Sequence, residues 1–390
     1  MSNAIKTSVT SALDFVGFSL PTNSSAETLN SERRRLEKIA VSSQFKNGKA
    51  IARMPKVQSP ESMLSVMWKL VCGRNRLKPQ VELPYLSVDT LTLSERSQEP
   101  RVTWLGHSSL FIELDKTRIL IDPVFEHASP WIAKPWFDRN VSMPISREKL
   151  PMPDVIVISH DHYDHLEEST VRFYAEKGLQ FFVPLAVGRH LERWGVDPDN
   201  ILEFDWWDEV TFHGVRFVAT PANHNSGRMG FDSNSTLWCS WALKSRSGSL
   251  FYSGDTAYDS HFKQIADRLG PFDMAFVEVA ANVKNGTGFP VENWGHMQAK
   301  HTIRAFKDLN ARQLCPIHWS TYELFSHQWD EPMNDLIEDA AESKVELVTP
   351  MVGQTIKVHG KNMTYRWWEE VASESATQSQ PVLSSVAVSD

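Results

Sequence analysis

The sequence predicts an α/β protein, on three observations. Short runs of branched apolar residues recur along the chain and are typical of buried strands, the clearest being Val155 to Ile158. Segments with helical character follow several of these runs, such as Glu167 to Lys177, which stops at Gly178. Polar residues, among them several histidines, stand where apolar runs end. Loops in such positions often carry functional sites, because a rigid strand holds them in place.

The first 100 residues precede the region of strong strand pattern. Residues 1–35 are rich in Ser, Thr and Asn and are expected to be disordered or loosely ordered. Residues 36–100 are expected to form an N-terminal arm. Ser31 to Val41 is predicted to be a short charged helix that Ser31 could cap, with Arg33 to Arg35 on a solvent-exposed face.

A second helix of the arm, from Ser62 to Cys72, is predicted to be amphipathic. Its apolar face comprises Met63, Val66, Met67 and Leu70. Basic residues stand close by, namely Lys69, Arg74, Arg76 and Lys78. The apolar face could pack against the main domain, or it could contact a membrane surface with help from the basic residues. The sequence leaves both explanations open.

Residues 101–371 are expected to form the main domain, and residues 372–390, rich in Ser, Ala, Gln and Val, a disordered tail. The predicted strands are 101–114, 117–121, 155–158, 181–184, 202–206, 210–221, 237–243, 249–253, 274–279 and 313–317. The predicted helices of this domain are 167–177, 186–194 and 297–309.

Composition excludes several classes of protein. The chain has 390 residues, 41% of them hydrophobic and 23% charged, as in an ordinary globular protein. A net charge of −8 argues against a nucleic-acid binder that uses a broad basic surface. Cys72, Cys239 and Cys315 are far apart and odd in number, which fits a reducing compartment. The N-terminus is a poor signal peptide, and no apolar run reaches transmembrane length. These two features favour a cytoplasmic location, with peripheral membrane contact possible.

Four candidate metal ligands lie within six residues directly after the strand that ends at Ile158: His160, His162, Asp164 and His165. Imidazoles at positions i and i+2 can face the same side of an extended segment, so His160 and His162 can bind one ion together. Asp164 and His165 lie beyond the turn and can face a second ion. These ligand types suit zinc, with iron or manganese as alternatives. A polar turn is the simpler explanation of a lone histidine, but not of four candidate ligands in this spacing.

Two other polar residues and one loop have two explanations each. His107 and Asp122 interrupt the first strands and could orient metal ligands, or they could be plain structural groups. The loop from Glu126 to Asn140 is rich in Trp, Pro and Phe. It could form a lip that meets substrate or membrane, or it could be a covered surface loop.

The string His-x-His-x-Asp-His at residues 160–165 resembles the signature of the metallo-β-lactamase superfamily of binuclear metallohydrolases. The resemblance implies a four-layer αββα sandwich, with the metal pair at one edge of the two sheets. It also implies a downstream His, Asp and His, in that order, each at the end of a core strand. His224, Asp255 and His318 meet this requirement.

The centre that the resemblance implies contains two zinc ions. One ion would be held by His160, His162 and His224, and the other by Asp164, His165 and His318. Asp255 and a shared hydroxide would bridge the ions. Two divalent ions bring four positive charges, of which the carboxylates and the hydroxide remove three, so about one positive charge remains. Such a centre favours an anionic substrate or transition state and activates water.

Several strings resemble one branch of the superfamily, the N-acyl-phosphatidylethanolamine-hydrolysing phospholipase D, over about Arg101 to Trp368. They include strings that metal binding does not require, such as Trp104-Leu-Gly-His-Ser108, Asp205-Trp-Trp207 and Leu237-Trp-Cys-Ser-Trp241. The resemblance implies a zinc-dependent phosphodiesterase that produces an N-acylethanolamine and phosphatidic acid. It implies catalytic roles for Asp164 and His296, and contact of Tyr163 and His296 with the substrate.

Two stretches depart from the pattern of this branch, Ala280 to Trp294 and Asn223 to Ser226. Both are expected to border the pocket, so the chemistry is better determined than the substrate. A related metal-dependent lactonase or small-phosphoester hydrolase is the alternative enzyme, and a metal-free binding module is the third class. The complete set of ligands argues against the third class. The expected partner is a phospholipid or another anionic phosphodiester and not a nucleic acid; a homodimer is one possible assembly.

Overall fold

Two β-sheets form the centre of the protein in a computed structural model that describes residues 26–54, 78–130, 137–228, 231–282, 295–324, 327–362 and 364–378. The first sheet has the strand order β15 (Thr355–Lys357), β3 (Arg101–Trp104), β4 (Leu110–Leu114), β5 (Thr117–Ile121), β6 (Val155–Val157), β7 (Gln180–Pro184), β8 (Ile201–Phe204). The second has the order β14 (Ala311–Ile317), β13 (Phe272–Glu278), β12 (Ser249–Tyr252), β11 (Ser240–Lys244), β10 (Val215–Thr220), β9 (Glu209–Phe212).

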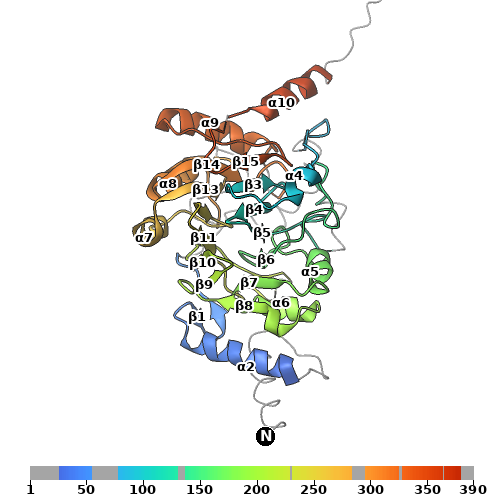
Figure 1. Cartoon of the computed structure of the whole chain (residues 1–390). Coiled ribbons are helices and arrows are strands. Elements are labelled where there is room, and N and C mark those ends of the chain that lie inside the picture. The colour runs from blue at the N-terminus through green and yellow to red at the C-terminus, as the bar shows by residue number, and fades with distance from the viewer. Residues whose placement is uncertain are drawn as a thin grey trace, which may run out of the picture.

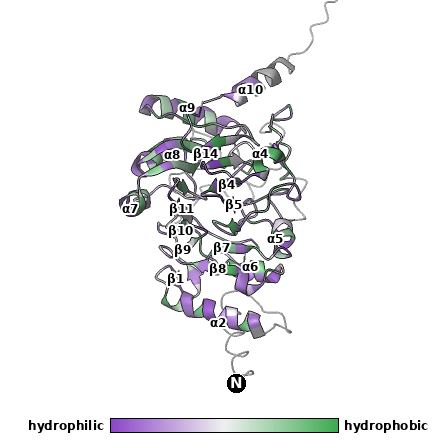
Figure 2. Ribbon diagram, viewed as in Figure 1, coloured by the Kyte–Doolittle hydropathy of each residue, from purple (hydrophilic) through white to green (hydrophobic). Residues whose placement is uncertain are grey.

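Helices cover the outer face of each sheet, which gives the expected four-layer αββα sandwich. In Figure 1, α7 (His261–Leu269) and α8 (Ala299–Asp308) lie to the left of the strands, and α5 (Glu168–Ala175) and α6 (Gly188–Arg193) lie to the right. Several of these helices alternate between hydrophilic and hydrophobic residues along their length, as Figure 2 shows, because only one face of each meets a sheet. The remaining elements are α2 (Ala26–Val41), β1 (Phe45–Lys46), β2 (Lys49–Ala50), α4 (Thr90–Ser94), the 3₁₀ helix η3 (Pro198–Asn200), α9 (Glu331–Ser343) and α10 (Trp367–Gln378).

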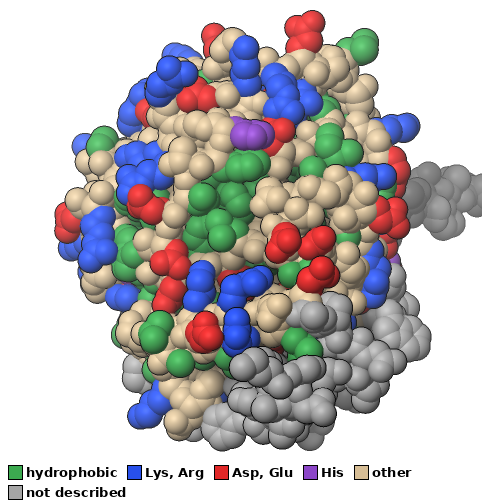
Figure 3. Space-filling model, turned by 60° about the horizontal axis from the view of Figure 1, so that its bottom comes forward, with side chains coloured by type: hydrophobic (Ala, Val, Ile, Leu, Met, Phe, Trp, Pro, Cys, Tyr) green, Lys and Arg blue, Asp and Glu red, His purple; other side chains and the backbone are tan. Residues whose placement is uncertain are grey.

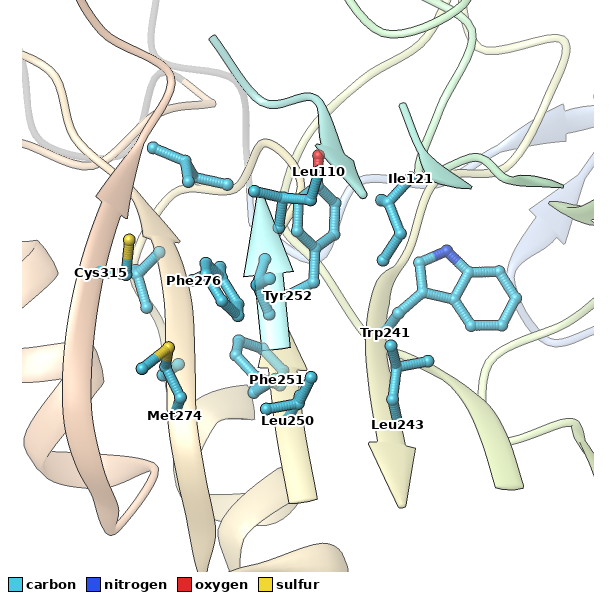
Figure 4. Packing of buried hydrophobic residues seen from close by; sticks show 14 of the residues in the cluster. Leu110, Ile121, Trp241, Leu243, Leu250, Phe251, Tyr252, Met274, Phe276 and Cys315 are labelled. Carbon is cyan, nitrogen blue, oxygen red and sulfur yellow. The ribbon is translucent and has the colours of Figure 1, made fainter. Parts of the chain in front are cut away.

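The period of two in a strand divides the apolar side chains of the first sheet between two layers. Leu110 and Ile112 belong to the core between the sheets, whereas Phe111 of the same strand packs with the residues beneath α5 and α6. Figure 4 shows Leu110 and Ile121 of the first sheet approaching the side chains of the second, among them Trp241 and Tyr252. Strands buried on both faces explain why their sequences are apolar runs without alternation.

Strand direction brings the turns with polar residues to one edge of the sandwich. Strands β5 to β8 run parallel to one another, and so do β12, β13 and β14. Parallel strands end at the same edge of a sheet, where ligands commonly bind. The turn that begins at Ser159 follows β6, Asp255 follows β12, and His318 directly follows β14. His224 follows the end of β10 in the second sheet.

The predicted strands are present, with boundaries shifted by a few residues, and so are the helices expected at 167–177, 186–194 and 297–309. The helices α7 and α9 were not predicted. The long run expected at 101–114 is two strands separated by the loop 105–109, which contains the interruption noted at His107. The run expected at 210–221 is also two strands, β9 and β10.

Two of the expected boundaries fall inside helices: the end of the loosely ordered N-terminus at residue 35 and the end of the main domain at residue 371. Helix α2 begins at Ala26, so a boundary at residue 35 falls inside a helix, and α10 continues to Gln378 past the boundary at residue 371. The expected solvent exposure of Arg35 is wrong: its side chain is 1% exposed and pairs with Glu32, Glu192 and Glu203. A helix pattern cannot reveal such burial, because Glu192 and Glu203 lie 157 and 168 residues away along the chain.

Some expectations lie outside the described residues. These are the amphipathic helix from Ser62 to Cys72, the aromatic loop from Trp131 to Trp136, most of the departure between Ala280 and Trp294, and the tail beyond residue 378. Among the described helices, none has the length and apolar character needed to cross a bilayer.

Candidate metal centre

The predicted ligands come together at the edge where strands of both sheets end. His160, His162, Asp164 and His165 come from the turn after β6, and His224, Asp255 and His318 from the second sheet. All seven lie in groups of side chains whose ligand atoms are within 4.8 Å of one another. Residues up to 158 positions apart in the sequence therefore meet in one cluster.

The first group consists of His160, His162, His224 and Asp255. Nδ1 of His162 lies 3.0 Å from Nε2 of His160 and 3.1 Å from Nε2 of His224. Nε2 of His160 and Nε2 of His224 lie 3.6 and 3.7 Å from Oδ2 of Asp255. Ligand nitrogens of a tetrahedral zinc ion with bonds of about 2.0 Å lie about 3.3 Å apart. The separations in this group fit such an ion.

The second group consists of Asp164, His165 and His318, which again face Asp255. Oδ2 of Asp164 lies 3.4 Å from Nε2 of both His165 and His318. Asp255 reaches the same two histidines with different oxygens, Oδ1 at 3.1 Å from His165 and Oδ2 at 3.2 Å from His318. Because Asp255 faces both groups, it stands where a carboxylate can bridge two ions.

The polar atoms of the cluster fit a cation. Nε2 of His165 and Oδ1 of Asp255 are buried, and neither makes a hydrogen bond of acceptable geometry to any group in the described parts of the chain. Buried polar atoms without hydrogen bonds are costly and call for a ligand. Two carboxylates and five imidazoles are the donor set that zinc and related divalent ions accept.

The pKa values of the clustered histidines also fit a site for a cation. Burial and neighbouring histidines lower the pKa of His160, so its ring is neutral and can coordinate a metal. Burial also lowers the pKa of His318, but Asp255 and Asp164 outweigh burial and raise it to about 10. Burial lowers the pKa of His165 as well, but the same two carboxylates outweigh burial and raise this pKa well above its ordinary value. The carboxylates thus require positive charge at this end of the cluster, and a divalent cation that displaces the protons would supply it.

Asp122 holds the turn after β6 in place. Its Oδ2 accepts a hydrogen bond from Nδ1 of His165 at 2.7 Å and another from the hydroxyl of Tyr252 at 2.6 Å. Its Oδ1 accepts from the backbone N–H of Ser159 at 2.7 Å. The side chain is fully buried. Of the two roles considered for Asp122, these contacts support orientation of a metal ligand.

His107 contacts the opposite side of the cluster. Its Nε2 lies 3.1 Å from Oδ2 of Asp164, and its backbone N–H donates to Oγ1 of Thr321 at 2.6 Å. The backbone N–H of His318 donates in turn to the carbonyl of His107 at 3.1 Å. His107 has φ of +50°, a conformation uncommon outside glycine. The loop 105–109 therefore positions two ligands, Asp164 and His318.

His296, predicted from the resemblance, borders the same cluster. Its Nε2 lies 3.8 Å from Oδ2 of Asp255, and its ring centroid is 5.0 Å from those of both His224 and His318. Nδ1 of His296 donates to Oε2 of Glu278 at 2.7 Å. The preceding residue, Gly295, accepts from Nδ1 of His224 at 2.7 Å. Gly295 has φ of +113°, and a Cβ there would lie 3.1 Å from Nδ1 of His224, so this contact requires glycine.

Tyr163, the other predicted substrate contact, lies under a partly buried arginine. The guanidinium carbon of Arg228 is 3.9 Å from the centroid of the Tyr163 ring. Arg228 also donates to the carbonyl oxygens of Asp161 and Leu166, at 2.7 Å each. The Asp161 carboxylate accepts from the backbone N–H of Gly227 at 2.8 Å. These bonds tie the turn of residues 160–166 to the segment that follows His224.

Sequence reasoning missed Glu278, Arg228 and Asp161. A carboxylate inside the apolar run of β13 was a signal for Glu278, since buried charges usually have a partner. Asp161 stands at a variable position of the motif His-x-His-x-Asp-His, so the motif does not mark it. No local pattern marks Arg228.

Comparison with known proteins gives a consistent set of relatives. Residues 117–319 match the family model described as a β-lactamase superfamily domain. An uncharacterised protein of Mycobacterium tuberculosis is 35% identical over 318 residues, which cover 79% of this chain and 82% of that protein. The N-acyl-phosphatidylethanolamine-hydrolyzing phospholipase D 1 of Caenorhabditis elegans is 28% identical over 255 residues, which cover 63% of this chain and 70% of the other. A solved structure of a metallo hydrolase from Ignicoccus hospitalis aligns with a TM-score of 0.51 at 18% identity, over 67% of this chain and 99% of the other.

Proposed function

The chain belongs to the β-lactamase superfamily and is a metal-dependent hydrolase, and we propose that it is a zinc-dependent phosphodiesterase of the phospholipase D type. The proposed substrate is N-acyl-phosphatidylethanolamine, and the products are an N-acylethanolamine and phosphatidic acid. Similarity to the enzyme of Caenorhabditis elegans over 63% of the chain supports this choice among the branches of the superfamily.

One observation carries the proposal: two groups of buried ligand atoms share the carboxylate of Asp255. Two ions held about 3.5–4 Å apart form a clamp that suits phosphoester hydrolysis, because it acts on both the attacking and the leaving oxygen. We propose zinc for both ions, with iron or manganese as alternatives. One ion would be held by His160, His162 and His224, and the other ion would be held by Asp164, His165 and His318. Asp255 would contact both ions.

Each part of the proposed centre has a defined task. Ions held by these residues would supply Lewis acidity, which would lower the pKa of water and polarise the phosphoryl group. Asp164 can accept a hydrogen bond from the attacking water through Oδ2, while His107 orients its carboxylate. His296 faces the centre through Nε2 and can exchange a proton with the substrate. Tyr163, half-buried beneath Arg228, would contact the headgroup.

The proposal extends to partners and location. The substrate is a lipid, so we propose transient contact with a membrane surface from a cytoplasmic location. Cys239 and Cys315 are buried free thiols, which is compatible with a reducing compartment. A homodimer is one proposed assembly. No nucleic acid is proposed as a partner, given the net charge of −8.

Metal analysis together with three substrates tests the proposal. Purified protein should contain about two ions per chain, and it should turn over N-acyl-phosphatidylethanolamine faster than a lactone. Bis-p-nitrophenyl phosphate serves as a generic diester. Turnover of the lactone alone would favour the lactonase alternative, and turnover of bis-p-nitrophenyl phosphate alone would favour a hydrolase of small phosphoesters. Full activity in metal-free protein would overturn the function altogether.

A further inference from the structure

Glu278 is a buried carboxylate that the seven predicted ligands leave unexplained. It is the last residue of β13, and its side chain is 0% exposed. Its Oε2 accepts from Nδ1 of His296 at 2.7 Å, and its Oε1 accepts from the backbone N–H of Thr256. An ionised carboxylate in an apolar strand is retained only when hydrogen bonds compensate for its burial. Both oxygens of Glu278 have such partners.

The rest of Glu278 is held just as firmly. Its backbone N–H donates to Oγ of Ser253 at 3.0 Å, and its carbonyl accepts from Oγ1 of Thr302 at 2.7 Å. The contact with His296 spans 18 residues along the chain, so the fold and not the local sequence creates it. A group fixed on every side can fix the ring that it contacts.

The hydrogen bond determines which nitrogen of His296 faces the centre. Because Nδ1 of His296 donates to Glu278, Nε2 is the nitrogen that faces the centre, 3.8 Å from Oδ2 of Asp255. Nε2 carries a lone pair when the ring is neutral and a proton when the ring is protonated. A carboxylate that holds a histidine in one orientation and tautomer is a recurring feature of proton transfer in hydrolases.

The exposed fractions of the side chains in the cluster place His296 on the side from which a substrate can approach. The side chains of His165 and His318 are 0% exposed, and that of Asp255 is 2% exposed. The side chains of Asp164 and His296 are 12% and 10% exposed. A substrate must approach from the side where the cluster is accessible, so His296 borders that approach.

We propose that Glu278 is a positioning residue that orients His296 as the proton donor to the leaving alcohol. This inference rests on the proposed phosphodiesterase function and adds the path of the proton. The water oxygen forms a bond to phosphorus while the bond from phosphorus to the ethanolamide oxygen breaks. Nε2 of protonated His296 gives its proton to that oxygen, and the proton released by the water restores His296.

The test compares two leaving groups on one lipid. Short-chain phosphatidyl esters of an N-acylethanolamine and of p-nitrophenol share the phosphatidyl part, but only the first leaving group needs a proton donor. In Glu278→Gln, the amide oxygen can still accept from Thr256, and the NH₂ group then faces His296 and forces the wrong tautomer. General acid–base catalysis contributes about 10²–10⁴-fold, so kcat on the ethanolamide ester should fall at least about 10²-fold. The kcat on the p-nitrophenyl ester should change little, with the metal content of the wild type retained.

Matched variants isolate the role of the pair. His296→Gln should show the same dependence on leaving group, and the double variant should lose no more than His296→Gln alone. Glu113→Gln is the control for removal of a buried strand carboxylate, since Glu113 pairs with Arg101 and Arg118 on the other sheet. It should not alter the ratio of the two rates. Equal losses on both esters in Glu278→Gln, or a double variant that multiplies the losses, would overturn the proposal.

A measurement on the wild type keeps the inference testable if Glu278→Gln does not fold. When the His296 ring is neutral, its ¹⁵N chemical shifts should show the proton on Nδ1, which donates to Glu278. A neutral ring that carries its proton on Nε2 would overturn the assigned orientation. This measurement needs no substrate. Absence of any diesterase activity would therefore refute the proposed function. The position of the proton on the His296 ring would still show whether Glu278 orients that ring.

Discussion

At the scale of single residues, three histidines of the centre are held by contacts of the ring nitrogen that faces away from the cluster. Nδ1 of His165 bonds to Asp122, that of His224 to the carbonyl of Gly295, and that of His160 lies 3.0 Å from Oγ of Ser159. Each of these rings therefore presents Nε2 to the cluster. His162 differs, because its Nδ1 faces the cluster. Such outer contacts set the tautomer and strengthen the ligand.

Asp255 should be the residue on which metal content depends most. Asp255→Ala removes the carboxylate that faces both groups, so we expect less than one ion per chain, against about two in the wild type. Inductively coupled plasma mass spectrometry after dialysis measures the content. Asp273→Asn, on the same sheet but paired with Arg312, is the control and should retain both ions. Full metal content in Asp255→Ala would exclude the bridging role.

Asp164 should matter for rate beyond its part in holding a metal. Asp164→Asn keeps the shape of the side chain but weakens its interaction with the attacking water and with one ion. Loss of an activated nucleophile should lower kcat by about 10³-fold or more. The measurement is kcat on a soluble diester, with metal content determined on the same sample. If Asp164→Asn keeps most of its kcat with both ions present, the role assigned to Asp164 is wrong.

At the scale of elements, helix α2 is joined to the sandwich by buried ion pairs. Arg35 of α2 pairs with Glu203 of β8, and Glu32 of α2 pairs with Arg189 of α6. All four side chains are 10% exposed or less. Removal of one partner of a buried pair costs about 3–5 kcal/mol, because the other charge is left uncompensated. Helix α2 is therefore an integral part of the fold.

Acid should weaken this attachment in a predictable direction. Burial by itself raises the pKa of Glu32, but Arg189 and Arg35 outweigh burial and lower it below its ordinary value. A carboxylate with a lowered pKa stabilises the folded state above its unfolded pKa, and this stabilisation is lost as pH falls through the folded pKa. The difference in unfolding free energy between wild type and Glu32→Gln should therefore be largest near pH 7. It should be smaller near pH 3, which lies below the ordinary pKa of a glutamate.

Urea unfolding at both pH values measures this difference. Glu27→Gln lies on the same helix at an exposed position, so its stability should follow that of the wild type at each pH. An unchanged gap between wild type and Glu32→Gln across the pH range would mean that Glu32 does not titrate with the attachment of α2.

At the scale of the whole molecule, the surface carries mixed charge. Figure 3 shows one face on which Lys and Arg alternate with Asp and Glu around a central gathering of hydrophobic side chains. The mixed charge of this face agrees with the modest net charge of −8, and this face offers no broad basic patch to a nucleic acid. Contact with a lipid surface would then depend on apolar groups more than on charge.

The segment from Met63 to Cys72 is the candidate for that contact. Replacement of Met67 and Leu70 with Asp should reduce activity on vesicles of N-acyl-phosphatidylethanolamine and phosphatidylcholine, because a single interfacial helix anchors only weakly and reversibly. Activity on a short-chain soluble diester should be spared. Vesicle cosedimentation provides a second readout.

The alternatives predict different patterns for the same variant. Equal loss on both substrates would mean that the helix packs against the main domain. Unchanged activity on both would remove this segment from the lipid site, and the lactonase alternative would gain weight. A variant with Ser62 and Ser65 replaced by Asp, on the polar side of the predicted helix, is the control and should behave like the wild type.

The sequence by itself determined the strands and the candidate ligands. Apolar runs identify buried strands because both faces of each central strand are covered, and the spacing of His160, His162, Asp164 and His165 is a local property of one turn. His224, Asp255 and His318 could be assigned because the resemblance to the superfamily implies a His, an Asp and a His in that order, and each of the three follows a predicted strand. The boundaries at residues 35 and 371 were less predictable, since helix ends depend on packing as well as on pattern.

Only the tertiary structure decided what surrounds the ligands. Asp122 reaches His165 across 43 residues, Glu278 reaches His296 across 18, and Arg35 reaches Glu203 across 168. A carboxylate or guanidinium has the same local sequence context whether it is solvated or paired in the interior. Its partner is selected when the sheets pack and parallel strands bring their ends to one edge. The candidate metal ligands could therefore be predicted from the chain. The choice between the two roles left open for His107 and Asp122, and the contact of Glu278 with His296, required the fold.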